Sequence, residues 1–353
     1  MVTRPSIVFV ALGSLDSTLA IRARLLAEGL AKLGWQSHVI YPKSESDPAQ
    51  IENVQTEGLS RHKPLFVAQV VQRLLTIAPH FVHFLNPSPI ATIIAGLISR
   101  SRTKIVGDWE DWHTMPTDPS IRNPIYRIAD RWFLRNADVI ITCSQWLADQ
   151  FAELRNRTVH YLPYAPVPKT WPSKENPFST PTAVFMGSLR KHWDHAVLLQ
   201  AMANLQKRGS KPKLSIIGSG EDLESCREYA TKNHLDNIEF AGHLDDATMH
   251  NALCWAHTLV FPFANKPLNL ARCPLKVFHY ASAKRPIITS PYGEVKEFLG
   301  DQAIYSDCTP EGYAHSIEAI MSGERLPDIA YAVSDQTWIQ RANTLQSILR
   351  SYL

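Results

Sequence analysis

The segment Ser6-Ile-Val-Phe-Val-Ala-Leu12 is a short apolar run rich in β-branched residues, and Gly13 ends it. The following segment, 19–33, places leucines at helical spacing, and a second apolar run covers Ser37–Tyr41. Because a strand, a helix and another strand in succession typically form a parallel pair, this stretch predicts a βαβ unit.

The same alternation continues along most of the chain, and it pauses only at 161–177, where five prolines fall close together. We therefore expect an α/β fold with two Rossmann-like, doubly wound domains that face a central cleft. The expected domains are 1–165, a linker at 166–180, a second domain at 181–330, and a terminal helix within 331–353 that packs back on the first domain. Further strands are expected at Phe81–Leu85, Lys104–Asp108, Val139–Cys143, Ala183–Met186, Lys213–Ile217, Ile238–Ala241, Thr258–Pro262 and Pro286–Ser290, and further helices at Val67–Ala78, Ile90–Ser99, Ile121–Asn136, Gln145–Leu154, His195–Arg208, Leu223–Asn233, Asp246–Ala256, Leu275–Ala283, Thr309–Ser322 and Trp338–Tyr352.

Composition excludes several classes of protein. The 353 residues are 45% hydrophobic and 20% charged, with a net charge of +3, which argues against disorder and against a dedicated nucleic-acid binder. The five cysteines are odd in number and form no C-x-x-C pair, so a reduced, cytoplasmic setting is expected. No apolar run is long enough to span a bilayer.

Two turns at the carboxyl ends of predicted strands are candidate ligand sites. The first follows Leu12, where Gly13 and Ser14 offer backbone N–H groups to an anion or a sugar hydroxyl; an ordinary capped loop is the alternative. The second follows the strand Ala183–Met186, where Gly187 precedes Arg190 and Lys191. Two cations beside a turn suit a diphosphate, although such a pair in a loop is more often at the surface.

The richest segment is 261–297, where Asn269 and Arg272 lie in a polar loop and Pro274 is expected to open a helix. Lys276 then falls in the first helical turn and His279 three residues later on the same face. An anion at the helix start is the functional interpretation; a solvent-facing lysine and a packed histidine are the alternative.

In the predicted first domain, Asp108-Trp-Glu-Asp-Trp-His113 lies just past a strand. Polar groups in this position are typical of a catalytic edge. His113, Asp108 and Asp111 are the candidate catalytic residues, and Trp109, Glu110 and Trp112 the candidate ligand contacts. A loop with a capping aspartate and two packed tryptophans is the alternative, and no metal-ligand spacing is evident.

A resemblance joins these segments. Pro274-Leu-Lys-Val-Phe-His-Tyr-Ala-Ser-Ala-Lys-Arg-Pro286 resembles the P-x-K-x-x-E-Y-x-A-x-G-x-P signature of family 4 glycosyltransferases, whose fold is GT-B. Further segments are similar to that family in order and spacing, namely 21–34, 129–144, 185–191, 216–221 and 240–244.

The resemblance implies a retaining glycosyltransferase that needs no metal or other cofactor and uses a nucleotide-diphosphate sugar, UDP- or GDP-linked. Lys276 matches the family's diphosphate lysine, and Arg190 or Lys191 its loop cation. The loop whose backbone meets the nucleobase matches Gly242, His243 and Leu244. The acceptor would be a glycan or a lipid-linked glycan. The resemblance implies that it lies on the first domain, so the acceptor-side residues would be Gly13, Ser14, Trp109, Glu110 and Trp112.

The family's E-x7-E pair falls on Ala271 and His279, so both glutamates are replaced. His279 keeps one hydrogen-bonding group for the ribose hydroxyls. A catalytically inactive binding partner and, less favoured, a nucleotide-sugar epimerase stay open as alternatives. Arg127, Arg131 and Arg135 form one helix stripe, which permits peripheral contact with an anionic membrane at its inner face; a solvated helix face is the alternative.

Overall fold

The computed structural model describes residues 4–13, 15, 18–43, 51–98, 102–112, 124–167, 175–323 and 329–353. The chain divides into two compact units. Unit 1 comprises 1–165, 270–273 and 337–353, and unit 2 comprises 166–269 and 274–336.

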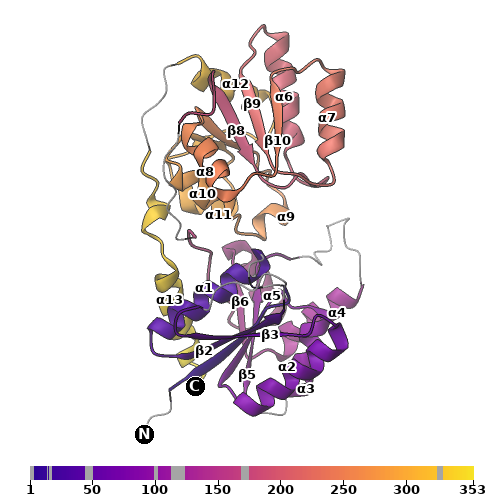
Figure 1. The fold of residues 1–353 in the computed structure, drawn as a ribbon, viewed down its shortest axis with the longest axis vertical. Coiled ribbons are helices and arrows are strands. Elements are labelled where there is room, and N and C mark those ends of the chain that lie inside the picture. The colour runs from indigo at the N-terminus through magenta and orange to yellow at the C-terminus, as the bar shows by residue number, and fades with distance from the viewer. Residues whose placement is uncertain are drawn as a thin grey trace. The chain divides into compact units, whose positions relative to one another are not determined.

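Unit 1 is a parallel sheet of seven strands in the order β3-β2-β1-β4-β5-β6-β7 (Figure 1). Chain order reverses between β1 and β4, which makes these two strands the switch point of the sheet. The strands are β1 (Ser6–Val10), β2 (Gln36–Pro42), β3 (Val54–Leu59), β4 (Phe81–Leu85), β5 (Lys104–Trp109), β6 (Val139–Thr142) and β7 (His160–Tyr161).

Helices cover both faces of this sheet, which explains why β1 and β4 are buried at every position and apolar at every position except Ser6 and His83. One face is covered by α1 and α13, and the other by α2, α3 and α4 (Figure 1). The helices are α1 (Thr18–Lys32), α2 (Lys63–Ile77), α3 (Pro89–Ile98), α4 (Pro124–Asn136), α5 (Gln145–Arg155) and α13 (Trp338–Arg350).

Local sequence explains where these helices begin and end. The Ser144 side chain accepts from Leu147 N at the start of α5, and Asn156 ends that helix in the left-handed conformation. Thr337 and Gln340 form a capping box that starts α13.

Unit 2 is a parallel sheet of six strands in the order β10-β9-β8-β11-β12-β13. Its switch point lies between β8 and β11. The strands are β8 (Thr182–Met186), β9 (Lys213–Ile217), β10 (Ile238–Gly242), β11 (Thr258–Phe261), β12 (Ile287–Thr289) and β13 (Ile304–Tyr305). The helices are α6 (Ala196–Lys207), α7 (Leu223–Lys232), α8 (Asp246–Trp255), α9 (Pro267–Leu270), α10 (Lys276–Ser282), α11 (Gly293–Leu299), α12 (Pro310–Met321) and the 3₁₀ turn η1 (Ala332–Asp335).

The α/β class with two Rossmann-like sheets is confirmed. Sequence reasoning missed β3, β7, β13, α9 and α11. It was also wrong about Pro274, because α10 begins at Lys276 and Pro274 lies in the preceding turn. All five cysteines are free thiols. Among the described residues, no helix is both long and apolar enough to cross a bilayer.

Candidate functional site

Two backbone turns at the carboxyl edge of unit 2 are packed so closely that only glycine fits. A Cβ at Gly218 would lie 2.1 Å from Gly187 O, and one at Gly220 would lie 2.1 Å from Leu189 O. Gly187 N donates to Ile217 O at 2.9 Å, which fixes the two turns to each other. The glycines of Ile216-Ile-Gly-Ser-Gly220 therefore serve close backbone approach.

The ammonium of Lys276 lies over the first of these turns. A Cβ on Gly187 would fall 2.3 Å from Lys276 Nζ, and Gly187 has φ +150°. Three aromatic rings surround the ammonium: its Nζ is 4.6 Å from the ring centre of Phe185, 4.5 Å from that of Phe261 and 5.7 Å from that of Trp193. Phe185 and Phe261 come from β8 and β11, so Lys276 places a positive charge at the switch point of the sheet.

Asp194, which sequence reasoning missed, ties together two loops beside this lysine. Its carboxylate accepts from Lys266 Nζ at 2.7 Å, from Asn269 Nδ2 at 2.7 Å and from Ala264 N at 3.0 Å. Asn269 is fully buried and also donates to Ala264 O at 2.8 Å. The structure thus gives the Asn269 amide a structural contact, whereas the sequence suggested donor binding.

The other predicted donor residues lie after strand ends of unit 2, on α10 or in unit 1. Arg190 and Lys191 are exposed on the loop after β8, and Arg190 lies over the Trp193 ring at 5.6 Å. Gly242 ends β10 with φ +69°, and the exposed His243 and half-buried Leu244 follow it. His279 is half-buried on α10.

Arg272 falls in unit 1, whereas the sequence placed it in the second domain. Leu270–Cys273 is part of unit 1, and Ala271 packs into the hydrophobic core of that unit. We therefore do not place Arg272 with the Lys276 cluster.

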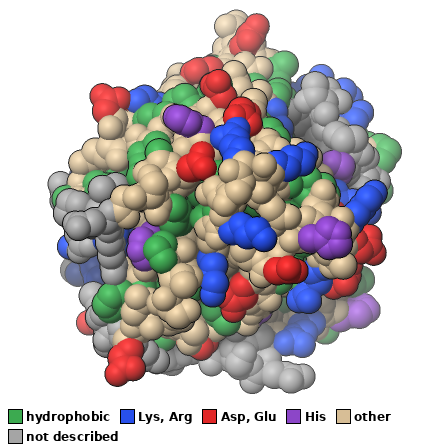
Figure 2. Space-filling view, turned by 90° about the horizontal axis from the view of Figure 1, so that it is seen from above, with side chains coloured by type: hydrophobic (Ala, Val, Ile, Leu, Met, Phe, Trp, Pro, Cys, Tyr) green, Lys and Arg blue, Asp and Glu red, His purple; other side chains and the backbone are tan. Residues whose placement is uncertain are grey.

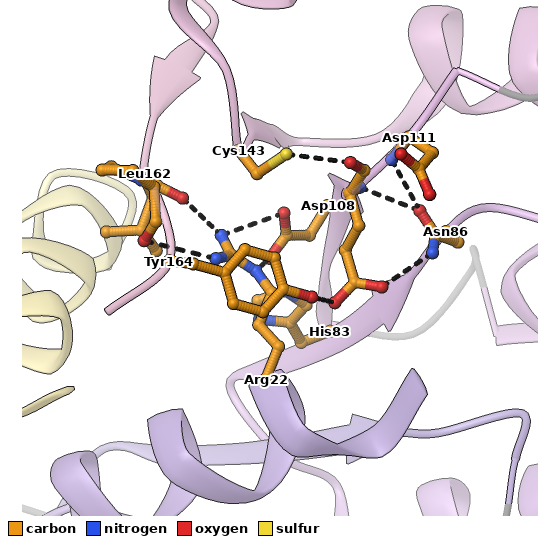
Figure 3. A network of polar contacts seen from close by, with 10 residues as sticks. Arg22, His83, Asn86, Asp108, Asp111, Cys143, Leu162 and Tyr164 are labelled. Carbon is orange, nitrogen blue, oxygen red and sulfur yellow. Dashed lines mark hydrogen bonds and ion pairs between the residues drawn. The ribbon is translucent and has the colours of Figure 1, made fainter. Parts of the chain in front are cut away.

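In unit 1, the predicted catalytic Asp108 is held in a buried ion pair (Figure 3). Arg22 Nε donates to Asp108 Oδ2 at 2.7 Å and Arg22 Nη2 to Oδ1 at 3.2 Å, while His83 Nε2 lies 3.0 Å from Oδ2. Arg22 and Asp108 are fully buried, so Asp108 is a positioning carboxylate without access to solvent. Arg22 Nη2 also donates to Leu162 O at 2.7 Å, which joins α1 and β5 to the last residues before the unit boundary.

A second carboxyl group, Glu110, lies beside this pair (Figure 3). The hydroxyl of Tyr164 donates to Glu110 Oε1, and Asn86 Nδ2 donates to Oε2 at 2.8 Å. Burial raises the pKa of Glu110 to about 8, although the hydrogen bond from Tyr164 and the charge of Arg22 oppose that rise. The raised pKa favours the protonated form of Glu110 at neutral pH, at the carboxyl edge of the sheet.

The remaining predicted residues of unit 1 differ in their placement. Trp109 is 1% exposed and donates to Asp130 Oδ1 at 3.0 Å, so it is a core residue with no face open to a sugar ring. Asp111 is half-buried, with its backbone N 3.4 Å from Asn86 Oδ1. Trp112 is half-buried against Phe151, and Gly13 lies just after β1. His113 and Ser14 lie outside the described residues.

Glu110 gives a prediction for the pH dependence of stability. The folded protein binds one proton more than the unfolded chain between about pH 4.5 and 8, so the free energy of unfolding falls as pH rises through that window. Glu110→Gln removes the titrating group; its amide oxygen can accept from Asn86 Nδ2 and its amide nitrogen can donate to the Tyr164 hydroxyl, so it should flatten this slope, as measured by urea unfolding at pH 5, 6, 7 and 8. An unchanged slope in Glu110→Gln would show that Glu110 is ionised in the folded state.

Among the described residues, one group of three side chains has the composition of a metal site: His195, Asp222 and Cys226, with ligand atoms within 4.8 Å of one another. His195 Nε2 and Asp222 Oδ2 are 2.7 Å apart, a hydrogen bond that satisfies both atoms. Burial raises the pKa of Cys226 to about 12, which disfavours the thiolate that a metal needs. We interpret the group as a structural contact between the loops after β8 and β9.

Comparisons with known proteins agree with this arrangement. Residues 17–165 match the family described as "Glycosyl transferase 4-like domain", and residues 180–322 match "Glycosyl transferases group 1". A curated relative is the glycogen synthase of Mycobacterium tuberculosis (strain CDC 1551 / Oshkosh), 24% identical over 199 residues. That match covers 55% of this chain and 47% of the relative, so the chain spans about half the length of this relative.

Two solved structures share the fold over nearly the whole chain. Anabaena Alr3699/HepE in complex with UDP and glucose has a TM-score of 0.69 at 14% identity, covering 98% of this chain and 99% of that one. The catalytic domain of starch synthase IV from Arabidopsis thaliana, bound to ADP and acarbose, has a TM-score of 0.69 at 10% identity, covering 99% and 98%. The two family matches and the two Rossmann-like sheets lead to one conclusion. The chain belongs to the family 4-like glycosyltransferases of the GT-B fold, with a 4-like first domain and a group 1 second domain.

Proposed function

We propose that the protein transfers a sugar from a nucleotide-diphosphate sugar to a glycan or lipid-linked acceptor, with retention at the anomeric carbon. The observation that carries this proposal is the Lys276 ammonium over Gly187, at the switch point of the unit 2 sheet. This is the position where a diphosphate would meet both a cation and the backbone of a turn.

The donor would lie on unit 2. Arg190 and Lys191 are exposed on the same edge and add charge for the diphosphate, while Gly242, His243 and Leu244 would meet the nucleobase. A UDP- or GDP-linked sugar is the proposed donor. UDP is supported by its presence in the Anabaena neighbour, although ADP is present in the plant neighbour.

The acceptor would lie on unit 1, near the edge that carries Glu110, Asp111 and Trp112. His113 stays the proposed catalytic histidine. We do not propose Asp108 as the group that moves a proton, because it is buried and paired with Arg22. Figure 2 shows one face of the molecule on which positive and negative side chains are interspersed, and no nucleic-acid partner is proposed.

The proposed mechanism is electrostatic. As the glycosidic bond breaks, negative charge grows on the departing diphosphate, and a cation already in place stabilises that charge without reorganisation. The acceptor hydroxyl would attack on the face that the diphosphate leaves, with a phosphate oxygen taking its proton. No metal or other cofactor enters the proposed mechanism.

A donor panel tests the function. We expect one class among UDP-, GDP- and ADP-sugars to bind in the micromolar range, an affinity of about 7–8 kcal/mol, and to be hydrolysed slowly without acceptor. Calorimetry gives the affinity, and chromatography of the released nucleotide gives the turnover. Failure of every nucleotide to bind would overturn the proposal.

A second candidate function is a catalytically inactive, nucleotide-binding partner subunit. The specific observation in its favour is that neither family glutamate is present: Ala271 is buried in the unit 1 core, and His279 occupies the other position. Nucleotide binding without turnover of any donor in the same panel would favour this candidate. A nucleotide-sugar epimerase is less favoured and predicts a changed sugar without transfer.

We also propose peripheral contact with an anionic membrane on the cytoplasmic side. The support is the arginine stripe of α4, formed by Arg127, Arg131 and Arg135. The same helix carries Ile125 and Ile128, which are 53% and 62% exposed.

A further inference from the structure

A groove of about 530 Å³ in unit 1 is lined by five arginines. Its other lining residues are Trp112, Asp130, Leu134 and Leu154. One wall comes from α4 and the other from the end of α5. The five arginines are Arg127, Arg131, Arg135, Arg155 and Arg157.

Within the part of the chain that the structure describes, these arginines lack the carboxylate partners that normally neutralise such a cluster. Among the described residues, none of the five forms an ion pair with an Asp or Glu side chain. Asp130, the acidic residue of the lining, is 7% exposed and accepts from Trp109 Nε1. The groove therefore gathers like charges that repel one another.

Arg155 is the arginine of this groove whose environment is least favourable for a charged group. Its Nη2 donates to Ala137 O at 2.6 Å, but its Nε and Nη1 are buried and have no hydrogen-bond partner among the described residues. Burial and, secondarily, the neighbouring charge of Arg157 lower the pKa of Arg155, while Tyr352 and Asp138 oppose this more weakly. Buried donors without acceptors destabilise a folded protein unless a ligand supplies the acceptors.

The side chains that line the groove indicate which kind of ligand it would bind. Guanidinium groups bind phosphoryl oxygens in a bidentate manner, and the space exceeds what a single phosphate fills. Leu154, which lines the groove, is 66% exposed, and the exposed Ile128 of α4 immediately follows Arg127. An anionic head and an apolar rim together match a phosphate or diphosphate that is carried by a lipid.

We infer that the groove between α4 and α5 is a second anion site, which binds the phosphoryl group of a lipid headgroup or of a phosphorylated acceptor. It is built only from unit 1 residues, whereas the proposed diphosphate site around Lys276 is built from unit 2 residues. The assignment to an acceptor rests on the proposed function; the anion binding itself does not.

The test uses the full chain and two probes. Inorganic pyrophosphate is titrated by calorimetry into Lys276→Met, which removes the cation of the proposed donor site. Co-sedimentation is measured with vesicles of phosphatidylcholine alone and with vesicles that contain 30% phosphatidylglycerol. The test variant is Arg131→Gln combined with Arg157→Gln, both exposed residues, and the matched control replaces the exposed Arg102 and Arg61, which lie outside the groove, with Gln.

We expect the test variant to bind the probe at least about tenfold more weakly, because it removes two guanidinium groups that would donate charged hydrogen bonds to the phosphoryl oxygens. The control variant should bind as the parent does. Loss of vesicle binding identifies a lipid headgroup as the source of the phosphoryl group, and loss of pyrophosphate binding alone identifies a soluble phosphorylated group.

The inference is overturned if neither probe binds, or if the control variant loses as much affinity as the test variant. Nucleotide affinity is measured on the same samples. A test variant that keeps its nucleotide affinity while losing the probe separates this site from the proposed donor site. A parent protein that binds the probe but no nucleotide would remove the proposed function and leave the groove.

Discussion

Replacing Lys276 with Met should lower turnover about 10²–10³-fold while the protein stays folded. The lysine is half-buried on α10, and Met keeps the apolar contacts with the rings of Phe185 and Phe261. What the variant loses is the positive charge over the Gly187 turn, which the proposed mechanism uses to stabilise the departing diphosphate. The measurement is the rate of nucleotide release at saturating donor, with circular dichroism as the check on folding.

Two variants sharpen this prediction. Lys232→Met removes one exposed lysine of α7 and should leave turnover unchanged. Gly187→Ala keeps the lysine but places a methyl group only 2.3 Å from its Nζ, so it should also reduce turnover by displacing the ammonium. Wild-type turnover in Lys276→Met would remove the proposed donor site, whatever Gly187→Ala does.

Sequence patterns predicted the sheets because the central strands are short, mostly apolar and buried on both faces, as in β1 and β4. They missed β3 for the opposite reason. Its sequence, Val-Gln-Thr-Glu-Gly-Leu, is buried only at Val54 and Leu59, as suits an edge strand, so it lacks an apolar run. The strands β7 and β13 have two residues each, too few to give any pattern.

Part of the candidate site could also be predicted, because local sequence patterns mark it. Lys276 could be placed from the local helix signal and the family motif. Asp194 could not, because its partners Lys266 and Asn269 lie more than 70 residues away in the chain. Arg22 reads as a surface residue on an amphipathic helix, and only the fold brings Asp108 to it from 86 residues away. Long-range polar pairs of this kind leave no periodic trace in a sequence.

The second large effect is expected at this buried pair. Asp108→Asn should destabilise unit 1 by about 3–5 kcal/mol, because it leaves the guanidinium of Arg22 fully buried without its counter-charge. Burial alone would raise the pKa of Asp108, but the charge of Arg22 and the hydrogen bond with His83 outweigh it, and the pKa lies below its usual value. The carboxylate therefore stabilises the fold above its unfolded pKa of about 3.8, and this stabilisation is lost as pH falls through the lower folded pKa.

Hydrogen exchange of the α1 and β5 amides, together with urea unfolding, measures this effect within unit 1. The matched control is the exposed pair Arg73–Glu57, also 2.7 Å apart, where Glu57→Gln should change stability by less than about 1 kcal/mol. The double variant Arg22→Met with Asp108→Asn should be less unstable than the sum of the two single variants, since no buried charge remains. Because Arg22 also donates to Leu162 O, its loss should weaken protection in 160–165 as well, next to the unit boundary. An Asp108→Asn variant as stable as the control would mean that the guanidinium finds other acceptors, and that the pair does not hold this edge of the sheet together.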